Sequence, residues 1–192
     1  MNQKSKGFTL IELMIVVCIM GILGLMGGIT IVKVLPGYQL QKAAREMDDN
    51  FRKARSLAIK FNSPVRVVFT VSSNKYTVDN KMTIAPNLPA YYGGGVKFGT
   101  PAPPPALPDS SARSTSECVH FTLGSGGADV GDTIVFNTRG LTETTDGKPG
   151  VVGYVYIQNS NREGYRIGVS GLAANIKMEK CESAGVNCLT NP

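Results

Sequence analysis

The chain has 192 residues, enough for one globular domain and an extension. Its 22 Gly and 11 Pro, with no Trp and 42% apolar residues, argue against an all-helical bundle and favour a turn-rich domain that contains strands. The formal net charge of +6 is a modest excess and only weak evidence for a nucleic-acid partner.

The chain starts with a short polar segment, residues 1–7, that carries Lys4 and Lys6. An apolar run follows from Phe8, and at about 1.5 Å per residue its stretch 13–32 reaches about 30 Å, the thickness of the hydrocarbon layer. The run is too long for the apolar core of a secretory signal and lacks a small-residue cleavage site, which makes a removable signal peptide the weaker alternative. We therefore expect residues 8–35 to form a transmembrane helix.

Glu12 is the one carboxylate near the start of this span. A charge in the membrane costs up to about 3 kcal/mol at the bilayer centre, so Glu12 needs a partner. Cleavage after Gly7 would place the new ammonium group of Phe8 where it could pair with Glu12 of a neighbouring copy. Pairing within one chain is the alternative. The G-x-x-x-G at residues 24–28 would let helices approach closely, or would loosen a single helix.

Beyond an interruption at Pro36 and Gly37, an amphipathic helix is predicted over residues 38–61. Apolar residues recur there at steps of three or four, as one face of a helix requires. They are Leu40, Ala43, Ala44, Met47, Phe51, Ala54, Ala58 and Phe61. The opposite face is charged and moderately basic, which indicates a solvated surface. Turn residues before Pro64 should end the helix.

The region 65–179 has the pattern of a predominantly antiparallel sheet, with strand-like runs separated by turn residues. The expected strands are residues 65–71, 75–79, 118–123, 133–136, 151–157, 165–170 and 175–179. Residues 85–96 are irregular, and the proline-rich and serine-rich stretch 99–117 predicts a long surface loop. The sequence thus predicts an α+β fold, with a long N-terminal helix packed on the sheet of a head at 36–192.

The four cysteines differ in context. Cys181 and Cys188 close a short loop, which in a chain that begins with a membrane segment indicates a disulfide formed in an oxidising compartment. Two free thiols are the alternative. Cys18 lies in the apolar run and Cys118 stands alone, and the sequence assigns neither a role. A zinc site is disfavoured because it needs four ligands and His120 is the only histidine.

No catalytic constellation has a diagnostic spacing, so we expect no enzyme activity, no cofactor and no bound metal. An enzyme anchored by its first helix is therefore the weakest hypothesis. Arg162, Arg166 and Lys177, together with Tyr165, could form a basic surface for nucleic acid. Scattered solvent-exposed charges explain the same residues.

The segment at residues 6–13, KGFTLIEL, resembles the processing site of type IV prepilins and type II secretion pseudopilins. The resemblance implies that prepilin peptidase cleaves after Gly7 and that the new N-terminus, Phe8, is methylated. It also implies that Glu12 helps to recruit and register subunits in a filament.

Most of the remaining chain resembles the minor pilins and pseudopilins of the GspH/FimT type, which implies a head of one helix and two sheets. The likeness rests on residues 54–58 leading into 65–69, on 134–136 with 139–140, and on 165–171. The Cys181–Cys188 loop also resembles the C-terminal disulfide loop of many pilins. Two departures are notable. Many major pilins have a proline in the membrane helix, where this chain has only glycines before Pro36, and Gly171-Leu172 stands where relatives often have Gly-Arg, which weakens a DNA-binding role.

The expected function is that of a structural minor subunit of a type IV pilus or a type II secretion pseudopilus. Its expected partners are other pilin or pseudopilin subunits, prepilin peptidase, the inner-membrane assembly platform and, before assembly, membrane lipid. The chain is expected to cross the bacterial inner membrane once with its head in the periplasm, and then to join the pilus or pseudopilus. The alternative is a DNA-binding minor pilin that assists DNA uptake.

Overall fold

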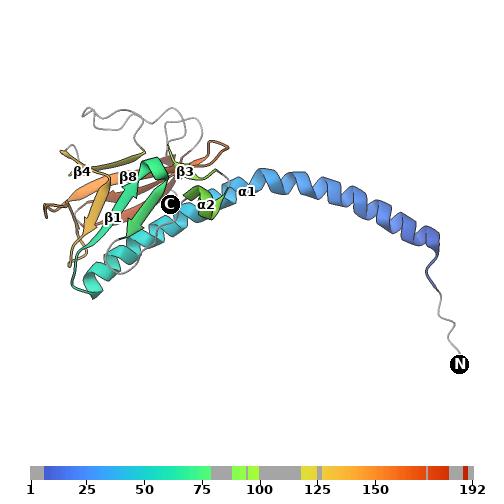
Figure 1. The fold of residues 1–192 in the computed structure, drawn as a ribbon, viewed down its shortest axis with the longest axis horizontal. Coiled ribbons are helices and arrows are strands. Elements are labelled where there is room, and N and C mark those ends of the chain that lie inside the picture. The colour runs from blue at the N-terminus through green and yellow to red at the C-terminus, as the bar shows by residue number, and fades with distance from the viewer. Residues whose placement is uncertain are drawn as a thin grey trace, which may run out of the picture. The chain divides into compact units, whose positions relative to one another are not determined.

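We describe the chain from a computed structural model (Figure 1). The structure describes residues 7–78, 88–93, 95–99, 118–124, 127–171, 173–181 and 188–189, without the side chains of residues 25–33 and 188–189. The chain divides into two compact units, Met1–Leu35 and Pro36–Pro192. Helix α1 contributes residues to both.

Helix α1 runs without a break over Leu10–Lys60, and Pro36 lies inside it (Figure 1). Pro36 and Gly37, which interrupt the sequence pattern, thus do not end the helix, and the expected long N-terminal helix is one element. A proline removes one helical hydrogen bond, and the bonds of the turns before and after it hold the helix together. The expected amphipathic helix 38–61 is the C-terminal part of this longer element and ends one residue earlier.

The apolar face expected for this part of α1 is buried, which confirms the helical periodicity. Its buried members are Leu40, Ala43, Ala44, Met47, Phe51, Ala54 and Ala58. Phe61 is the exception, with 44% of its surface exposed. It lies in the turn after the last helical residue, where the periodicity of the helix no longer determines which way a side chain faces.

The first sheet contains four strands in the order β2-β1-β6-β7. These strands are β1 (Val65–Thr70), β2 (Lys75–Val78), β6 (Thr133–Phe136) and β7 (Thr142–Glu143). All neighbours are antiparallel. The hairpin expected between residues 65 and 79 is confirmed, and the short 3-10 helix η1 (Val71–Ser73) makes its turn.

The second sheet is larger, with the order β11-β10-β9-β8-β4-β5, and β3 also pairs with β8. Its strands are β3 (Lys97–Phe98), β4 (Val119–Leu123), β5 (Asp129–Gly131), β8 (Val151–Gln158), β9 (Gly164–Ser170), β10 (Asn175–Cys181) and β11 (Cys188–Leu189). Each pair is antiparallel. The α+β class and the two-sheet head are confirmed.

An aromatic cluster around Phe69 joins α1 to both sheets. The Phe69 ring of β1 lies 5.9 Å from that of Phe51 on α1, 5.8 Å from that of Tyr76 on β2 and 5.8 Å from that of Phe121 on β4. Phe98 on β3 adds an edge-to-face contact at 5.9 Å. Such ring pairs contribute about 0.5–1.5 kcal/mol each beyond their buried area. The core of the head is therefore centred where the helix meets the two sheets.

The sequence missed the shortest elements. Strands β3, β5, β7 and β11 were not expected, and helix α2 (Leu88–Tyr92) lies in the stretch 85–96 that was expected to be irregular. Two or three residues give too few repeats for a period to show. Apart from Gly99, the expected surface loop 99–117 lies outside the described residues.

Among the helices that the described residues form, none has an apolar stretch long enough to cross a membrane. The transmembrane segment expected at 13–32 includes residues 25–32, whose side chains lie outside the description. The membrane span stays a prediction.

Candidate functional site

The start of α1 is built as a capping box around Thr9 and Glu12. The backbone N–H of Glu12 donates to Thr9 Oγ1 at 3.3 Å, and the backbone N–H of Thr9 donates to Glu12 Oε2 at 3.4 Å. The Thr9 hydroxyl also donates to Glu12 Oε2 at 3.4 Å. This reciprocal arrangement satisfies two backbone donors that have no partner inside the helix. Glu12 thus has a partner within its own chain.

The sequence reasoning missed this capping box, although its signal, Thr-x-x-Glu before an apolar run, stands at residues 9–12. The pairing of Glu12 with an ammonium group on Phe8 of a neighbouring copy stays a prediction. Gly7 and Phe8 lie just before the helix and are exposed, with Phe8 at 78%. The proposed cleavage site is therefore accessible.

Large apolar side chains of the first turns of α1 are exposed. They are Leu10, Ile11, Leu13, Met14, Ile15, Val16, Val17, Ile19, Met20, Ile22 and Leu23. A protein that stays monomeric in water rarely exposes so large a contiguous apolar surface.

The residues of the expected basic surface do not form one patch of free cations. Arg166 on β9 donates from both Nε and Nη2 to Glu179 Oε2 on β10, and its Nε bond measures 2.7 Å. Its guanidinium also lies 4.7 Å from the centre of the Tyr154 ring on β8. Burial opposes the charge of Arg166, but Glu179 and Tyr156 outweigh it, so the pKa of Arg166 is raised.

The other members of the expected basic surface lie apart from this pair. Lys177 is exposed on β10, and Tyr165 is buried on β9. Arg162 is exposed in the turn between β8 and β9. The positive charge of Arg166 is therefore paired with Glu179 within the sheet. Arg162 and Lys177 lie on different elements.

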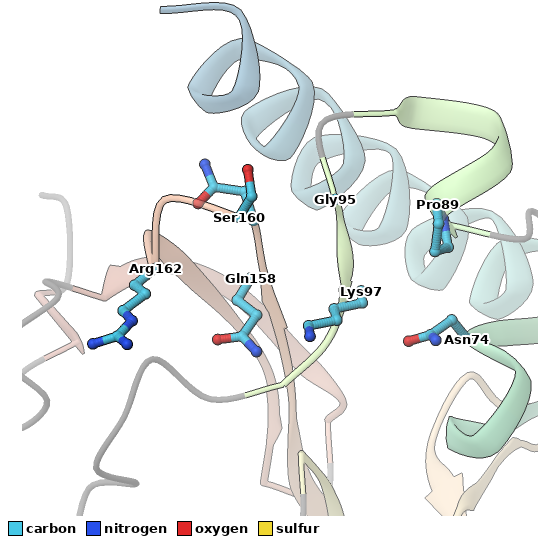
Figure 2. A pocket seen from close by; sticks show the side chains of 8 residues that line it. Asn74, Pro89, Gly95, Lys97, Gln158, Ser160 and Arg162 are labelled. Carbon is cyan, nitrogen blue, oxygen red and sulfur yellow. The ribbon is translucent and has the colours of Figure 1, made fainter. Parts of the chain in front are cut away.

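Arg162 belongs instead to a cleft of ≈ 570 Å³, which Lys97 of β3 and Gln158 of β8 also line (Figure 2). Asn74 and Pro89 lie on its opposite side (Figure 2). Lys97 and Gln158 are directly opposite each other in the β3–β8 register. The cleft thus collects two cations and three amide side chains, which come from the turn at Asn74, from β3 and from the segment 158–162.

The register of β10 and β11 places Cys181 opposite Cys188. Cα partners in adjacent antiparallel strands are close enough for a disulfide in favourable geometry. Cys181 is buried. The Cys181–Cys188 disulfide stays a prediction that this register supports.

Two protein-family models match the chain, one at its N-terminal segment and one over most of the head. Residues 2–28 match the prokaryotic N-terminal methylation motif. Residues 43–173, more than half of the chain, match the type II transport protein GspH. No curated protein and no solved structure matches the chain. The resemblance inferred from KGFTLIEL and from the head is thereby confirmed, and the chain belongs to the GspH family of pilin and pseudopilin subunits.

Proposed function

We propose that this chain is a structural, non-enzymatic minor subunit of a type IV pilus or a type II secretion pseudopilus. Prepilin peptidase cleaves it after Gly7, and Phe8 becomes the methylated N-terminus. Before assembly, α1 holds the subunit in the inner membrane with the head in the periplasm. During assembly, the assembly platform transfers the helix from lipid to the filament core.

The observation that carries this proposal is the exposed apolar start of α1, which lies within the matched methylation motif at residues 2–28. One helical segment with apolar side chains on all sides is suited first to lipid and then to the apolar core of a helical filament. Within the head, the buried core of the described residues begins at Leu40. Assembly through α1 is therefore compatible with an unchanged head.

Mass spectrometry of the chain recovered from filaments tests the processing. We expect an N-terminus at Phe8 that carries one methyl group. A mature filament subunit that begins with Met1 would contradict the proposed cleavage.

The registry role of Glu12 can be separated from its capping role, because Gln also completes a capping box. Glu12→Gln keeps the hydrogen bond to Thr9 and removes the charge, so we expect normal membrane insertion and at least tenfold less incorporation into filaments. Thr9→Ala is the matched control: it removes the cap at a cost of about 1 kcal/mol but keeps the carboxylate, so incorporation should remain near normal. Full incorporation of Glu12→Gln would contradict the registry role.

A further inference from the structure

We propose that the cleft between Arg162 and Lys97 binds a carboxylate side chain in an acidic segment of a neighbouring filament subunit. This inference rests on the proposed function, which supplies the neighbour. It adds a contact between the head and a neighbouring subunit to the packing of α1 in the filament core.

The strand pairing fixes where Lys97 leaves the sheet beside Gln158. Lys97 and Gln158 are cross-strand partners, and such pairs have Cβ atoms about 4.5–5.5 Å apart. Figure 2 shows the ends of Arg162, Gln158 and Lys97 in a row along one side of the cleft. A carboxylate has two oxygens that accept several hydrogen bonds, so a row of cationic and amide donors suits it.

The turn that carries Arg162 is rigid. Asn159 is buried, and its Oδ1 accepts hydrogen bonds from the backbone N–H of Asn161 at 2.9 Å and of Glu163 at 3.0 Å. Its Nδ2 donates to Glu163 Oε2 at 2.7 Å. Within this turn Arg162 adopts φ = 63°, a left-handed conformation that is uncommon for a residue other than glycine. Strain of this kind persists where the surroundings impose it and is concentrated at functional sites.

The positive charge of the cleft is not neutralised within the described part of the chain. There, neither Lys97 nor Arg162 has an ion pair or a side-chain hydrogen bond, in contrast to Arg166. The nearby carboxylate of Glu163 is bonded to Asn159 and also lies against Gly37, where an added Cβ would come within 3.2 Å of its Oε2. Two cations therefore remain available to a ligand of opposite charge.

The amide of Asn74 adds a donor. Its Oδ1 already accepts the backbone N–H of Phe98 at 3.0 Å, so its NH₂ group is what remains for a ligand. An ionised carboxylate accepts hydrogen bonds and donates none, so it can accept from this free NH₂ group.

A protein carboxylate fits the cleft better than a nucleic acid does. Binding of single-stranded nucleic acid combines a track of cations with aromatic rings on which bases stack. The described lining of the cleft has two cations and no aromatic ring. Its volume of ≈ 570 Å³ lies in the range of pockets for small molecules, which leaves room for one or two acidic side chains. One or two acidic side chains of a partner therefore match its size and charge.

The test uses the full chain in micelles of an uncharged detergent and a fluorescent peptide of alternating Glu and Gly. A second peptide with Gln in place of each Glu is the matched probe. We expect the Glu peptide to bind at least tenfold more tightly than the Gln peptide, because a hydrogen bond to a charged group is worth about a factor of ten or more. Affinity that does not distinguish the two peptides would overturn the proposal.

Three variants locate the binding. Arg162→Asn removes the charge, and asparagine tolerates a left-handed backbone, so the affinity for the Glu peptide should fall about tenfold. Lys97→Gln should lower this affinity by a similar factor. Lys177→Gln removes a cation on β10 outside the cleft and should have no effect. Unchanged affinity in both Arg162→Asn and Lys97→Gln would overturn the proposal, as would a single-stranded oligonucleotide that binds the cleft more tightly than the Glu peptide.

Incorporation into filaments distinguishes this proposal from the proposed function. If the wild-type chain is absent from filaments but binds the Glu peptide in an Arg162-dependent way, the filament role fails and the cleft assignment stands as a carboxylate site. If the wild-type chain enters filaments and the Glu peptide binds no better than the Gln peptide, the cleft assignment fails and the filament role stands.

Discussion

Tyr76 and Asn50 form a buried polar pair in the core, where Asn50 Nδ2 donates to Tyr76 Oη at 2.7 Å. Burial raises the pKa of Tyr76 to about 12, and the hydrogen bond from Asn50 opposes that rise. The folded chain therefore holds the phenolic proton more tightly than the unfolded chain, whose tyrosines titrate near 10. The stability that this difference supplies is complete below pH 10 and is lost as the pH rises from about 10 to about 12.

Tyr76→Phe removes the phenolic proton, so the variant should lack this contribution to the pH dependence of stability. At neutral pH the variant should be less stable by about 1–3 kcal/mol, because the buried Asn50 amide loses its partner. Between about pH 10 and pH 12 its free energy of unfolding should fall less than that of the wild-type chain. Urea unfolding at several pH values measures both quantities. Equal pH slopes for the two chains would contradict the raised pKa.

At the residue scale, the sequence revealed residues with a local signal and missed those defined by distant contacts. Glu12 is predictable as a functional residue because a carboxylate in an apolar run is unusual. The pairing of Arg166 with Glu179 depends on the register of β9 and β10, which no local pattern shows. The left-handed backbone of Arg162 likewise depends on the turn that Asn159 holds, so the sequence found this cation but not the cleft beside Lys97.

Strand β8 shows how closely the elements of the second sheet pack. An added Cβ at Gly153 would lie 2.1 Å from the carbonyl oxygen of His120 on β4 and 2.7 Å from Phe121 Cα. At Gly168 on β9 an added Cβ would lie 2.9 Å from the Tyr154 ring, and the nearest backbone atom, the Gly153 carbonyl oxygen, is 3.8 Å away. Backbone atoms in a paired strand cannot move aside without breaking the ladder, whereas a ring can shift.

Gly153→Ala should therefore destabilise the chain by about 3 kcal/mol or more, and Gly168→Ala by about 1 kcal/mol. Thermal unfolding followed by circular dichroism compares the two variants under identical conditions. A larger loss for Gly168→Ala would mean that the close approach of β4 and β8 does not limit the packing.

Elements with many repeats of their period were predictable. The apolar face of α1 and the strands β1, β2, β4, β6, β8, β9 and β10 were expected within two residues of their observed bounds. Strands β3, β5 and β7 exist because a longer neighbour pairs with them, as β8 does with β3. Their two or three residues are too few to show a periodic pattern. Pairing with distant strands determines them, so a local reading of the sequence could not predict them.

The division of the whole molecule at Leu35 and Pro36 places all the buried apolar side chains of the described residues in the second unit. The buried face of α1 starts at Leu40, four residues beyond Pro36. A fragment 36–192 therefore retains the aromatic cluster, both sheets and the helix face that covers them.

We expect the fragment 36–192 to unfold cooperatively, with a thermal midpoint equal to that of the head in the full chain. A fragment 50–192 is the control, because it lacks Leu40, Ala43, Ala44 and Met47 of the core. Loss of large buried side chains costs about 2–5 kcal/mol each, which approaches the stability of a whole domain, so this fragment should not fold. A fragment 36–192 without a cooperative transition would show that the first turns of α1 contribute to the stability of the head.

The capping box at Thr9 and Glu12 implies a threshold for polymerisation. A carboxylate that already serves its own helix can engage a neighbour only by exchanging one set of bonds for another. Leaving the cap costs about 1 kcal/mol, so the exchange needs a partner, such as the proposed ammonium group of Phe8, that stabilises the carboxylate by more than this. In an uncleaved chain no ammonium stands at Phe8, and the exchange has no driving force. The proposed proteolysis at Gly7 would then permit assembly, because it creates an ammonium group that could pair with Glu12 of a neighbouring copy.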